Sequence, residues 1–230
     1  MDTVQRRNRL IGWLETIRAD VQDLLLDQHL FWELQAVIDA NPRFAQEPGL
    51  FNQWMASSFV QATAVGVRRQ AKFGDDSISL RRFLLEVRQC PTLVSREFYL
   101  SFFADAAGWL KEIGEHHFDS IAGKDGNELP TALLDQQIRR LEEAVAAIEH
   151  YVDRRVAHYD QRGLARPVPT FKDLENALKA LEELVLFYWV LLKGVSMSSL
   201  LPTIQYDWQS VFTFAWIDRR ESGVESSGSV

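Results

Sequence analysis

The stretch TALLDQQIRRLEEAVAAIEHYVDRRVAHY, residues 131–159, decides the class of fold. Its apolar residues recur at steps of three and four, which places them on one face of an α-helix. Because such a face must be buried against something, the stretch predicts a long helix that packs on other elements. The apolar face consists of Leu134, Ile138, Leu141, Val145, Ile148, Val152, Val156 and Tyr159.

The same spacing recurs along most of the chain, and no stretch alternates apolar and polar residues as a half-buried strand would. Hydroxyl side chains that can cap helices stand at Ser77 or Ser79, at Ser95 and at Thr170, which has Asp173 three residues later. Further helices are therefore predicted at 3–40, at about 50–73, at 79–89, from Ser95, from Thr170 and at about 202–217.

These elements predict an all-α protein, a single-domain bundle of about six or seven helices over residues 1–218. A polar tail, 219–230, follows and is expected to be disordered. The clearest loop is 119–130, and most Trp and Phe residues are interpreted as core packing. In the helix from Ser95, the side chains expected to face inward are Phe98, Phe102, Ala106, Trp109 and Leu110.

Composition limits the classes of function. The 230 residues carry a formal net charge of −7, which excludes general adhesion to nucleic acid or anionic membrane and leaves only a local basic patch. The one cysteine, Cys90, excludes an intramolecular disulfide. The first residues lack the apolar region of a signal peptide, and the longest apolar run, 184–192, is too short to span a bilayer. We therefore expect a soluble cytoplasmic protein without a membrane partner.

The stretch YVDRRVAHYD, residues 151–160, carries the main candidate site. On an ideal helix His158 lies about 120° from the centre of the apolar face, and Arg154 and Arg155 lie one turn earlier on the same side. An imidazole beside two guanidinium groups can move a proton during RNA cleavage while arginine holds the phosphate. The alternative is structural, because cations near a helix C-terminus interact favourably with its dipole.

A second basic cluster lies upstream, at Arg68, Arg69, Lys72, Arg81 and Arg82. It is interpreted either as a solvated face or as a phosphate-binding patch near the histidine helix. In the first interpretation its partners would be the nearby acids Asp75, Asp76 and Glu86.

Metal and nucleotide sites find no support in the spacing. Glu115, His116, His117 and Asp119 lie close together, but adjacent histidines on a helix point about 100° apart and no HxxxH or HExxH spacing occurs. The segment GKDGN lacks the spacing of a P-loop. No metal and no cofactor is therefore predicted.

The stretch RRVAHYD on a late helix resembles the histidine helix of the HEPN superfamily. VRRQAKFGDDSISLRRFLLEV, residues 67–87, is similar to the arginine-rich segment of HEPN-like proteins related to the AbiU abortive-infection family. The resemblance implies a helical bundle, often dimeric, in which two histidine helices form a composite site. It also implies metal-independent ribonuclease activity in catalytic members, which often act as toxins or antiviral effectors.

The catalytic motif of the superfamily has an arginine, then four to six intervening residues, then the histidine, and at the corresponding positions this chain has Asp153, Val152 and Tyr151. Two hypotheses stay open. In the first, the protein is an RNA-cleaving toxin or defence effector, with His158 as the acid/base group, Arg154 and Arg155 as phosphate ligands and Asp160 as an orienting charge. In the second, it binds RNA, a nucleotide or a protein such as an antitoxin without cleaving.

A homodimer is expected under both hypotheses. Ala144, Ala147 and Tyr151 lie beside the apolar face of 131–159 and allow close approach of a second helix. A third possibility is a purely structural helical dimer.

Overall fold

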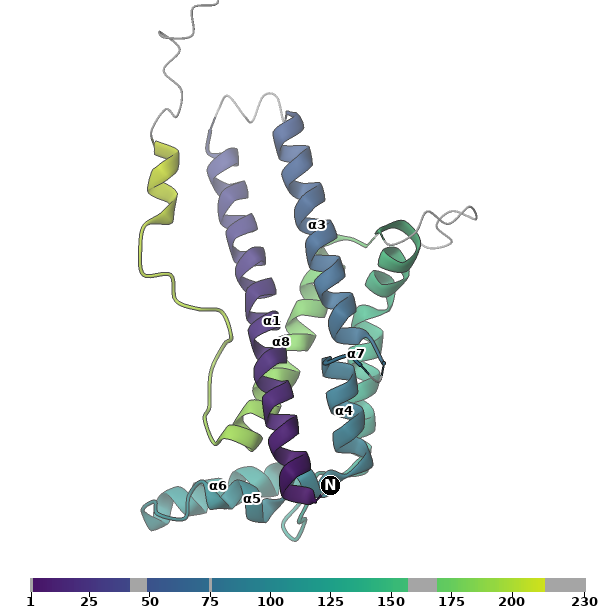
Figure 1. The fold of residues 1–230 in the computed structure, drawn as a ribbon. Coiled ribbons are helices and arrows are strands. Elements are labelled where there is room, and N and C mark those ends of the chain that lie inside the picture. Colours follow the sequence, from purple (N-terminus) through teal and green to yellow (C-terminus); the bar gives the residue numbers. More distant parts are fainter. Residues whose placement is uncertain (1, 42–48, 75, 157–168, 214–230) are drawn as a thin grey trace, which may run out of the picture.

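A computed structural model describes residues 2–41, 49–74, 76–156 and 169–213; for Arg155 and Val156 it describes the backbone alone. Over these ranges the protein is an all-α bundle without a β-strand, as predicted (Figure 1). The elements are α1 (Thr3–Asp39), α3 (Leu50–Ala71), α4 (Leu80–Gln89), η1 (Pro91–Val94), α5 (Arg96–Ser101), α6 (Gly108–Ala122), α7 (Thr131–Tyr151), η2 (Val152–Val156), α8 (Phe171–Lys193) and η3 (Trp208–Thr213).

The four long helices α1, α3, α7 and α8 form the body of the bundle, with α4 beside α7 (Figure 1). Their apolar faces meet in one continuous core, in which Leu14, Leu141, Val185 and Tyr188 are fully buried. Each such side chain stabilises the fold by about 1.5–3 kcal/mol relative to an exposed position. Since the core draws on all four helices, it sets the position of α7 against α3 and α4.

Within α7 the predicted apolar face is confirmed as far as Val152, which is buried together with Leu134, Val145 and Ile148. The α-helix itself ends at Tyr151, and Val152–Val156 form a π-helical turn. A π-turn advances by fewer degrees per residue than an α-helix. The prediction of a regular α-helix is therefore wrong for Val152–Val156. His158 and Asp160 lie outside the described residues.

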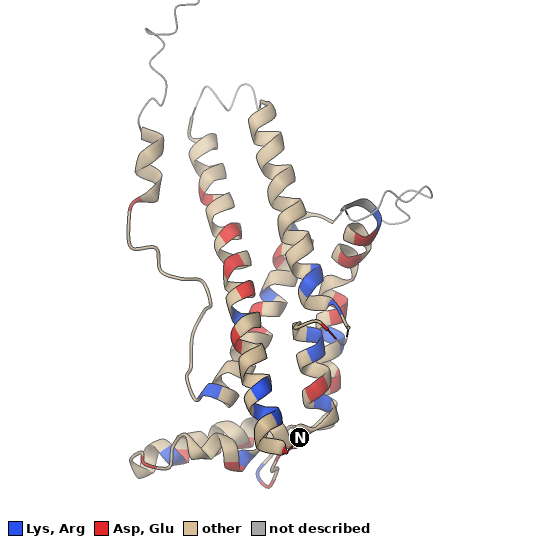
Figure 2. Cartoon of the chain, in the orientation of Figure 1, with Lys and Arg blue, Asp and Glu red and all other residues tan. Residues whose placement is uncertain are grey.

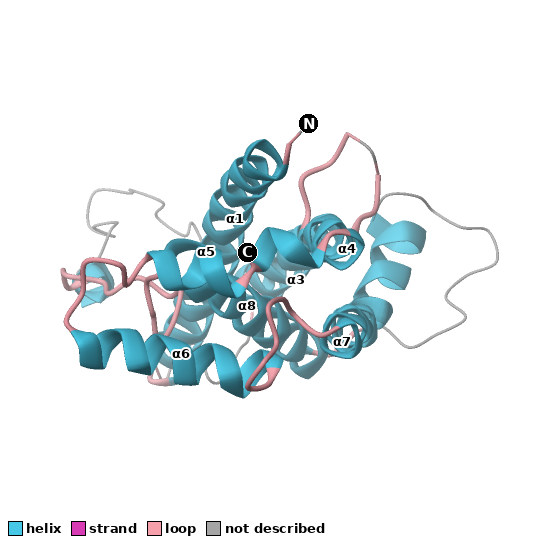
Figure 3. Cartoon of the chain, turned by 90° about the horizontal axis from the view of Figure 1, so that it is seen from below, coloured by secondary structure: helices cyan, strands magenta, loops and turns pink. Residues whose placement is uncertain are grey.

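The single helix predicted from Ser95 is wrong. Ser95 does cap α5, since its Oγ accepts from the backbone N–H of Phe98 at 3.2 Å, but the chain turns at 102–107 and continues as α6. Figure 3 shows the two helices lying side by side across the lower end of the bundle. The turn depends on packing of the Phe103 ring on Gly114, where a Cβ would lie only 2.9 Å from that ring.

This turn exposes side chains that were expected to face inward. Trp109 is 61% exposed and Phe102 is 40% exposed. Among the tryptophans in the described part of the chain, Trp13 and Trp189 pack against the core and Trp32, Trp54 and Trp109 are exposed, so the interpretation as core packing holds for only some of them. Helix α6 also runs through Ala122, which shortens the predicted loop to begin at Gly123 with φ of +83°.

The C-terminal part differs most from prediction. Helix α8 begins with the predicted capping box, in which hydrogen bonds from Thr170 lower the pKa of Asp173, and ends at Gly194 with φ of +66°. Beyond it, the predicted helix at 202–217 is an extended strap with one 3-10 turn at Trp208–Thr213, and 214–217 lie outside the described residues. The strap returns along α1 (Figure 1), and near its start the backbone N–H of Leu200 donates to Glu182 Oε1 on α8 at 2.8 Å.

The domain boundary at 218 and the tail fall beyond the described residues. No helix that the structure describes is both long and apolar enough to cross a membrane.

Candidate functional site

The two sequence segments singled out as chemical candidates are adjacent in the fold. A turn between α3 and α4 brings both helices against α7. The turn is held by buried Gln70, whose Oε1 accepts from the backbone N–H of Leu80 at 3.0 Å, and by Ser79, whose Oγ donates to the carbonyl of Lys72 at 2.5 Å. The arginines of α3 and α4 are therefore presented from a rigid corner.

Two of these arginines face α7 directly. Arg68 Nε lies 2.7 Å from Asp153 Oδ1 in η2, immediately before Arg154. Arg81 Nη2 lies 2.6 Å from Glu142 Oε1 in the middle of α7. The predicted proximity of the arginine-rich segment to the histidine helix is thus observed for Arg68 and Arg81.

A third carboxylate, Glu149, lies between these pairs. Burial raises its pKa, the nearby Arg81 and Arg68 lower it, and the like charges of Asp153 and Glu142 raise it again, for a net upward shift. Figure 2 shows the resulting alternation of basic and acidic residues where α3, α4 and α7 meet. The layer comprises Arg68, Arg81, Glu142, Glu149 and Asp153; we call it the charged layer.

The ion pairs of the charged layer are partly exposed to solvent. The side chains of Arg68 and Arg81 are 30% and 32% exposed, and Asp153 and Glu142 are 52% and 42% exposed. Exposed ion pairs contribute about 0–1 kcal/mol each. A dianionic or polyanionic ligand that offers several oxygens can displace such carboxylates, because arginine binds phosphate through paired donors.

The other two candidate arginines face away from α7. Arg69 pairs with Asp20 on α1. Arg82 donates to the carbonyls of Gly74 at 3.1 Å and Ser77 at 3.0 Å, and its guanidinium lies 4.7 Å from the Trp13 ring centre. These contacts bind the α3–α4 turn to α1, so both residues have structural roles in this state.

The prediction of local acid partners is wrong for Glu86 and Asp76. Glu86 binds Arg6 and Arg9 of α1, at 3.4 and 3.2 Å. Asp76 makes no ion pair within the described part of the chain, and Asp75 lies outside it. The acids that the basic cluster does contact, Asp20, Glu142 and Asp153, lie far away in the sequence. For the acids near the end of α7, the available signal was the spacing of Glu142, Glu149 and Asp153 in the sequence, since steps of seven and four residues share one helix face.

Within the stretch RRVAHYD, Arg154 lies in η2, where it is half-buried and has an interaction partner. Single-turn π-helices occur frequently at functional sites.

His150, in the last turn of α7, was not singled out from the sequence. Its Nε2 is buried and has no hydrogen-bond partner among the described residues.

The strip proposed for dimer contact is partly covered by the protein itself. Ala144 and Ala147 are half-buried, and Tyr151 packs against the core of its own chain. Close approach of a second helix would therefore rest on the two alanines.

In the group of acids and histidines on α6, His117 and Asp119 have protein partners. Tyr99 Oη and His117 Nδ1 share a hydrogen bond of 2.8 Å, and burial lowers the pKa of His117. Asp119 pairs with Arg96 at 2.7 Å. Across the described ranges, no three His, Cys, Asp or Glu side chains gather as they would around a metal ion.

The chain matches the family model HEPN_AbiU2, described as AbiU2, over residues 8–209. It belongs to the HEPN-type AbiU2 family. The match runs from α1 to η3 and so includes both segments that form the charged layer and its surroundings. Family membership makes this an abortive-infection-related helical protein. Comparison with curated proteins and with solved structures gave no match.

Proposed function

We propose that this AbiU2-family protein is a metal-independent endoribonuclease that acts as an abortive-infection effector or toxin. The observation that carries the proposal is the contact between Arg68 and Asp153, which joins the arginine-rich segment to the start of the RRVAHYD stretch. Phosphate ligands from α3, α4 and η2 thereby flank the segment that leads to His158.

In this mechanism His158 removes the proton of a ribose 2′-hydroxyl, and the resulting oxygen attacks the adjacent phosphorus. The bond to the 5′-oxygen breaks, and that oxygen leaves with a proton from an acid group, which a second His158 can supply in a dimer. Arg154 and Arg155 hold the phosphate and its developing charge, and Asp160 orients the imidazole. Arg68 and Arg81 extend the phosphate-binding surface when RNA displaces Asp153 and Glu142.

The test is cleavage of RNA in the presence of a chelator. We expect His158→Ala to abolish chelator-resistant cleavage, and Arg154→Ala or Arg155→Ala to reduce it by about 10²- to 10³-fold. His116→Ala is the matched control, because His116 is exposed on α6 and distant from the charged layer. Cleavage that survives in His158→Ala, or that is lost equally in His116→Ala, contradicts the assignment.

A composite site also requires a homodimer. We expect a dimeric mass by scattering at micromolar concentration, and Ala147→Arg to convert it to a monomer and to remove cleavage together. A monomeric native protein that still cleaves RNA contradicts the two-subunit site.

A second candidate function is RNA or nucleotide binding without cleavage, and a specific observation favours it. The positions where catalytic members carry arginine hold Tyr151, Val152 and Asp153, so the arginine of the strict catalytic motif is missing. RNA binding that weakens in Arg68→Ala and Arg81→Ala, with no cleavage in any variant, would assign this function.

A further inference from the structure

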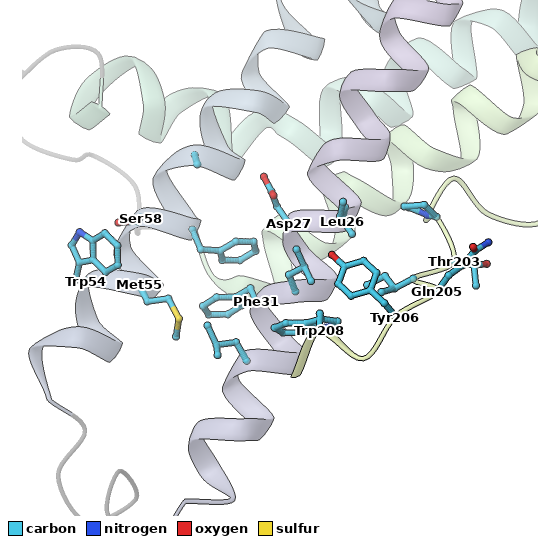
Figure 4. Close-up of a pocket in the computed structure, with 16 residues that line it drawn as sticks. Leu26, Asp27, Phe31, Trp54, Met55, Ser58, Thr203, Gln205, Tyr206 and Trp208 are labelled. Carbon is cyan, nitrogen blue, oxygen red and sulfur yellow. The ribbon is translucent and has the colours of Figure 1, made fainter. Parts of the chain in front are cut away.

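A large cavity lies in the upper part of the bundle, away from the charged layer. It has a volume of about 840 Å³ and is formed by α1, α3 and the C-terminal strap (Figure 4). Ligand pockets in proteins enclose roughly 300–1,000 Å³. No residue of the charged layer lines this cavity. On α3 the cavity is lined by residues between Trp54 and Ala62, which precede Arg68.

The walls are mostly apolar, and five of the residues that line the cavity are aromatic. Helix α1 contributes Leu26, Leu30 and Leu34, one turn apart, and Phe31, whose ring stacks on Phe59 of α3 with centroids 4.1 Å apart. Figure 4 shows Tyr206 and Trp208 reaching in from the strap and Trp54 and Met55 placed on α3. Such walls bury an alkyl chain or an aromatic ring system.

The strap that closes one side is fixed at both ends. Ser199 Oγ and the backbone N–H of Leu200 donate to Glu182 of α8 at 2.7 and 2.8 Å. At the far end, the amide of Gln209 donates to Glu33 of α1. The cavity is therefore formed before any ligand arrives, which lowers the entropic cost of binding.

The charged side chain that lines the cavity, Asp27, is acidic. Asp27 lines it, Asp23 lies one helical turn earlier, and the residues that line it include no Lys, Arg or His. Neither carboxylate forms an ion pair within the described ranges, whereas Asp20 on the same helix is neutralised by Arg69. Like charges four residues apart destabilise a helix, and burial together with Asp23 raises the pKa of Asp27. A cation beside Asp27 would relieve this repulsion.

We propose that this cavity binds a cationic amphiphile, a molecule with an alkyl or aromatic body among the aromatic walls and an ammonium group beside Asp27. The apolar walls supply most of the affinity, and the carboxylate selects the sign of the charge. This cavity is separate from the proposed RNA site. A failure to bind the amphiphile would not contradict RNA cleavage, and a failure to cleave RNA would not contradict amphiphile binding.

The experiment uses three probes with the same ten-carbon chain: decylamine, decanol and decanoate. Binding to the full chain is measured by isothermal calorimetry below the solubility limit of each probe. We expect decylamine to bind about tenfold more tightly than decanoate, with decanol between them. Asp27→Asn should remove the preference for the amine and leave decanol unchanged.

A blocking variant locates the binding. Ser58 lines the cavity, and Ser57 beside it does not, although both are exposed on α3. Ser58→Trp should weaken decylamine binding at least about tenfold, and Ser57→Trp should leave it unchanged. Ala62→Phe repeats the block if Ser58→Trp fails to fold by circular dichroism. Undetectable binding, equal affinity for the three probes, or equal loss in both tryptophan variants overturns the proposal.

Discussion

The two long faces of α7 are held by different kinds of interaction. The apolar face, with Leu141, Val145 and Ile148, is fully buried against the other long helices. The charged face, with Glu142 and with Asp153 in the adjoining turn η2, meets arginines through half-exposed ion pairs. The first face supplies nearly all the free energy that positions the helix, so the second can exchange its partners without unfolding the protein. That division is what a phosphate-binding surface on a stable bundle requires.

The largest effect should come from the apolar face. Leu141→Ala removes a fully buried side chain and leaves a cavity, so we expect the free energy of unfolding to fall by about 2–5 kcal/mol. Glu143→Ala, at an exposed position of the same helix, is the control and should change it by less than about 0.5 kcal/mol. Chemical denaturation measures both. Similar losses in the two variants would show that the apolar face does not dominate.

A smaller effect is expected from the polar pair buried within that face. Tyr188 Oη donates to Gln137 Oε1 at 2.5 Å, and burial raises the pKa of the Tyr188 hydroxyl far above its ordinary value. Tyr188→Phe leaves the Gln137 amide buried without this partner, which should cost about 1–3 kcal/mol.

The double variant Tyr188→Phe with Gln137→Leu sharpens this prediction, because it removes both polar groups. It should recover most of the stability lost in the single variant. If both variants are equally destabilised in denaturant titrations, the loss arises from packing and not from an unsatisfied amide.

The sequence predicts the buried apolar faces of the helices well and the contacts of the charged residues less well. A spacing of 3.6 residues identifies the long helices, because each is buried along one face, and the caps at Ser79, Ser95 and Thr170 are local. The turn at 102–107 was missed because it depends on the contact of Phe103 with Gly114, which lies on the next helix.

The candidate site was predictable only in part. The contact of the arginine-rich segment with the end of α7 agreed with the order of the two segments in the HEPN resemblance. The partners of its arginines did not follow from nearby acids, because Arg68 and Arg81 pair across 85 and 61 residues. The π-turn at Val152–Val156 also has no signal in the spacing of apolar residues, since Val152 and Val156 fit a regular helix.

The charged face should show the reverse pattern to the core. Arg68→Ala and Arg81→Ala should each lower the free energy of unfolding by less than about 1 kcal/mol, because their ion pairs are half-exposed. The same changes should weaken RNA binding, and each should reduce the dependence of affinity on salt by about one phosphate contact. Arg140→Ala, on the side of α7 that pairs with Glu183 of α8, is the control. If Arg140→Ala weakens RNA binding equally, the charged layer is not the binding surface.

The smallest effect concerns Glu149, whose pKa is raised by burial more than Arg81 and Arg68 lower it. A carboxyl group with a raised pKa in the folded state binds its proton more tightly there than in the unfolded chain. It therefore favours folding below its ordinary pKa of 4.5, and this advantage is lost as the pH rises through the folded-state value. Glu149→Gln removes the charge, so at pH 7 it should stabilise the protein by at most about 0.5 kcal/mol, after allowance for solvent screening. Near pH 4 the variant and the native protein should have nearly equal stability. Thermal denaturation at both pH values measures the difference. A destabilised Glu149→Gln at pH 7 would mean that Glu149 is a net partner of Arg68 and Arg81, and that these arginines are less available to phosphate than the exposed pairs indicate.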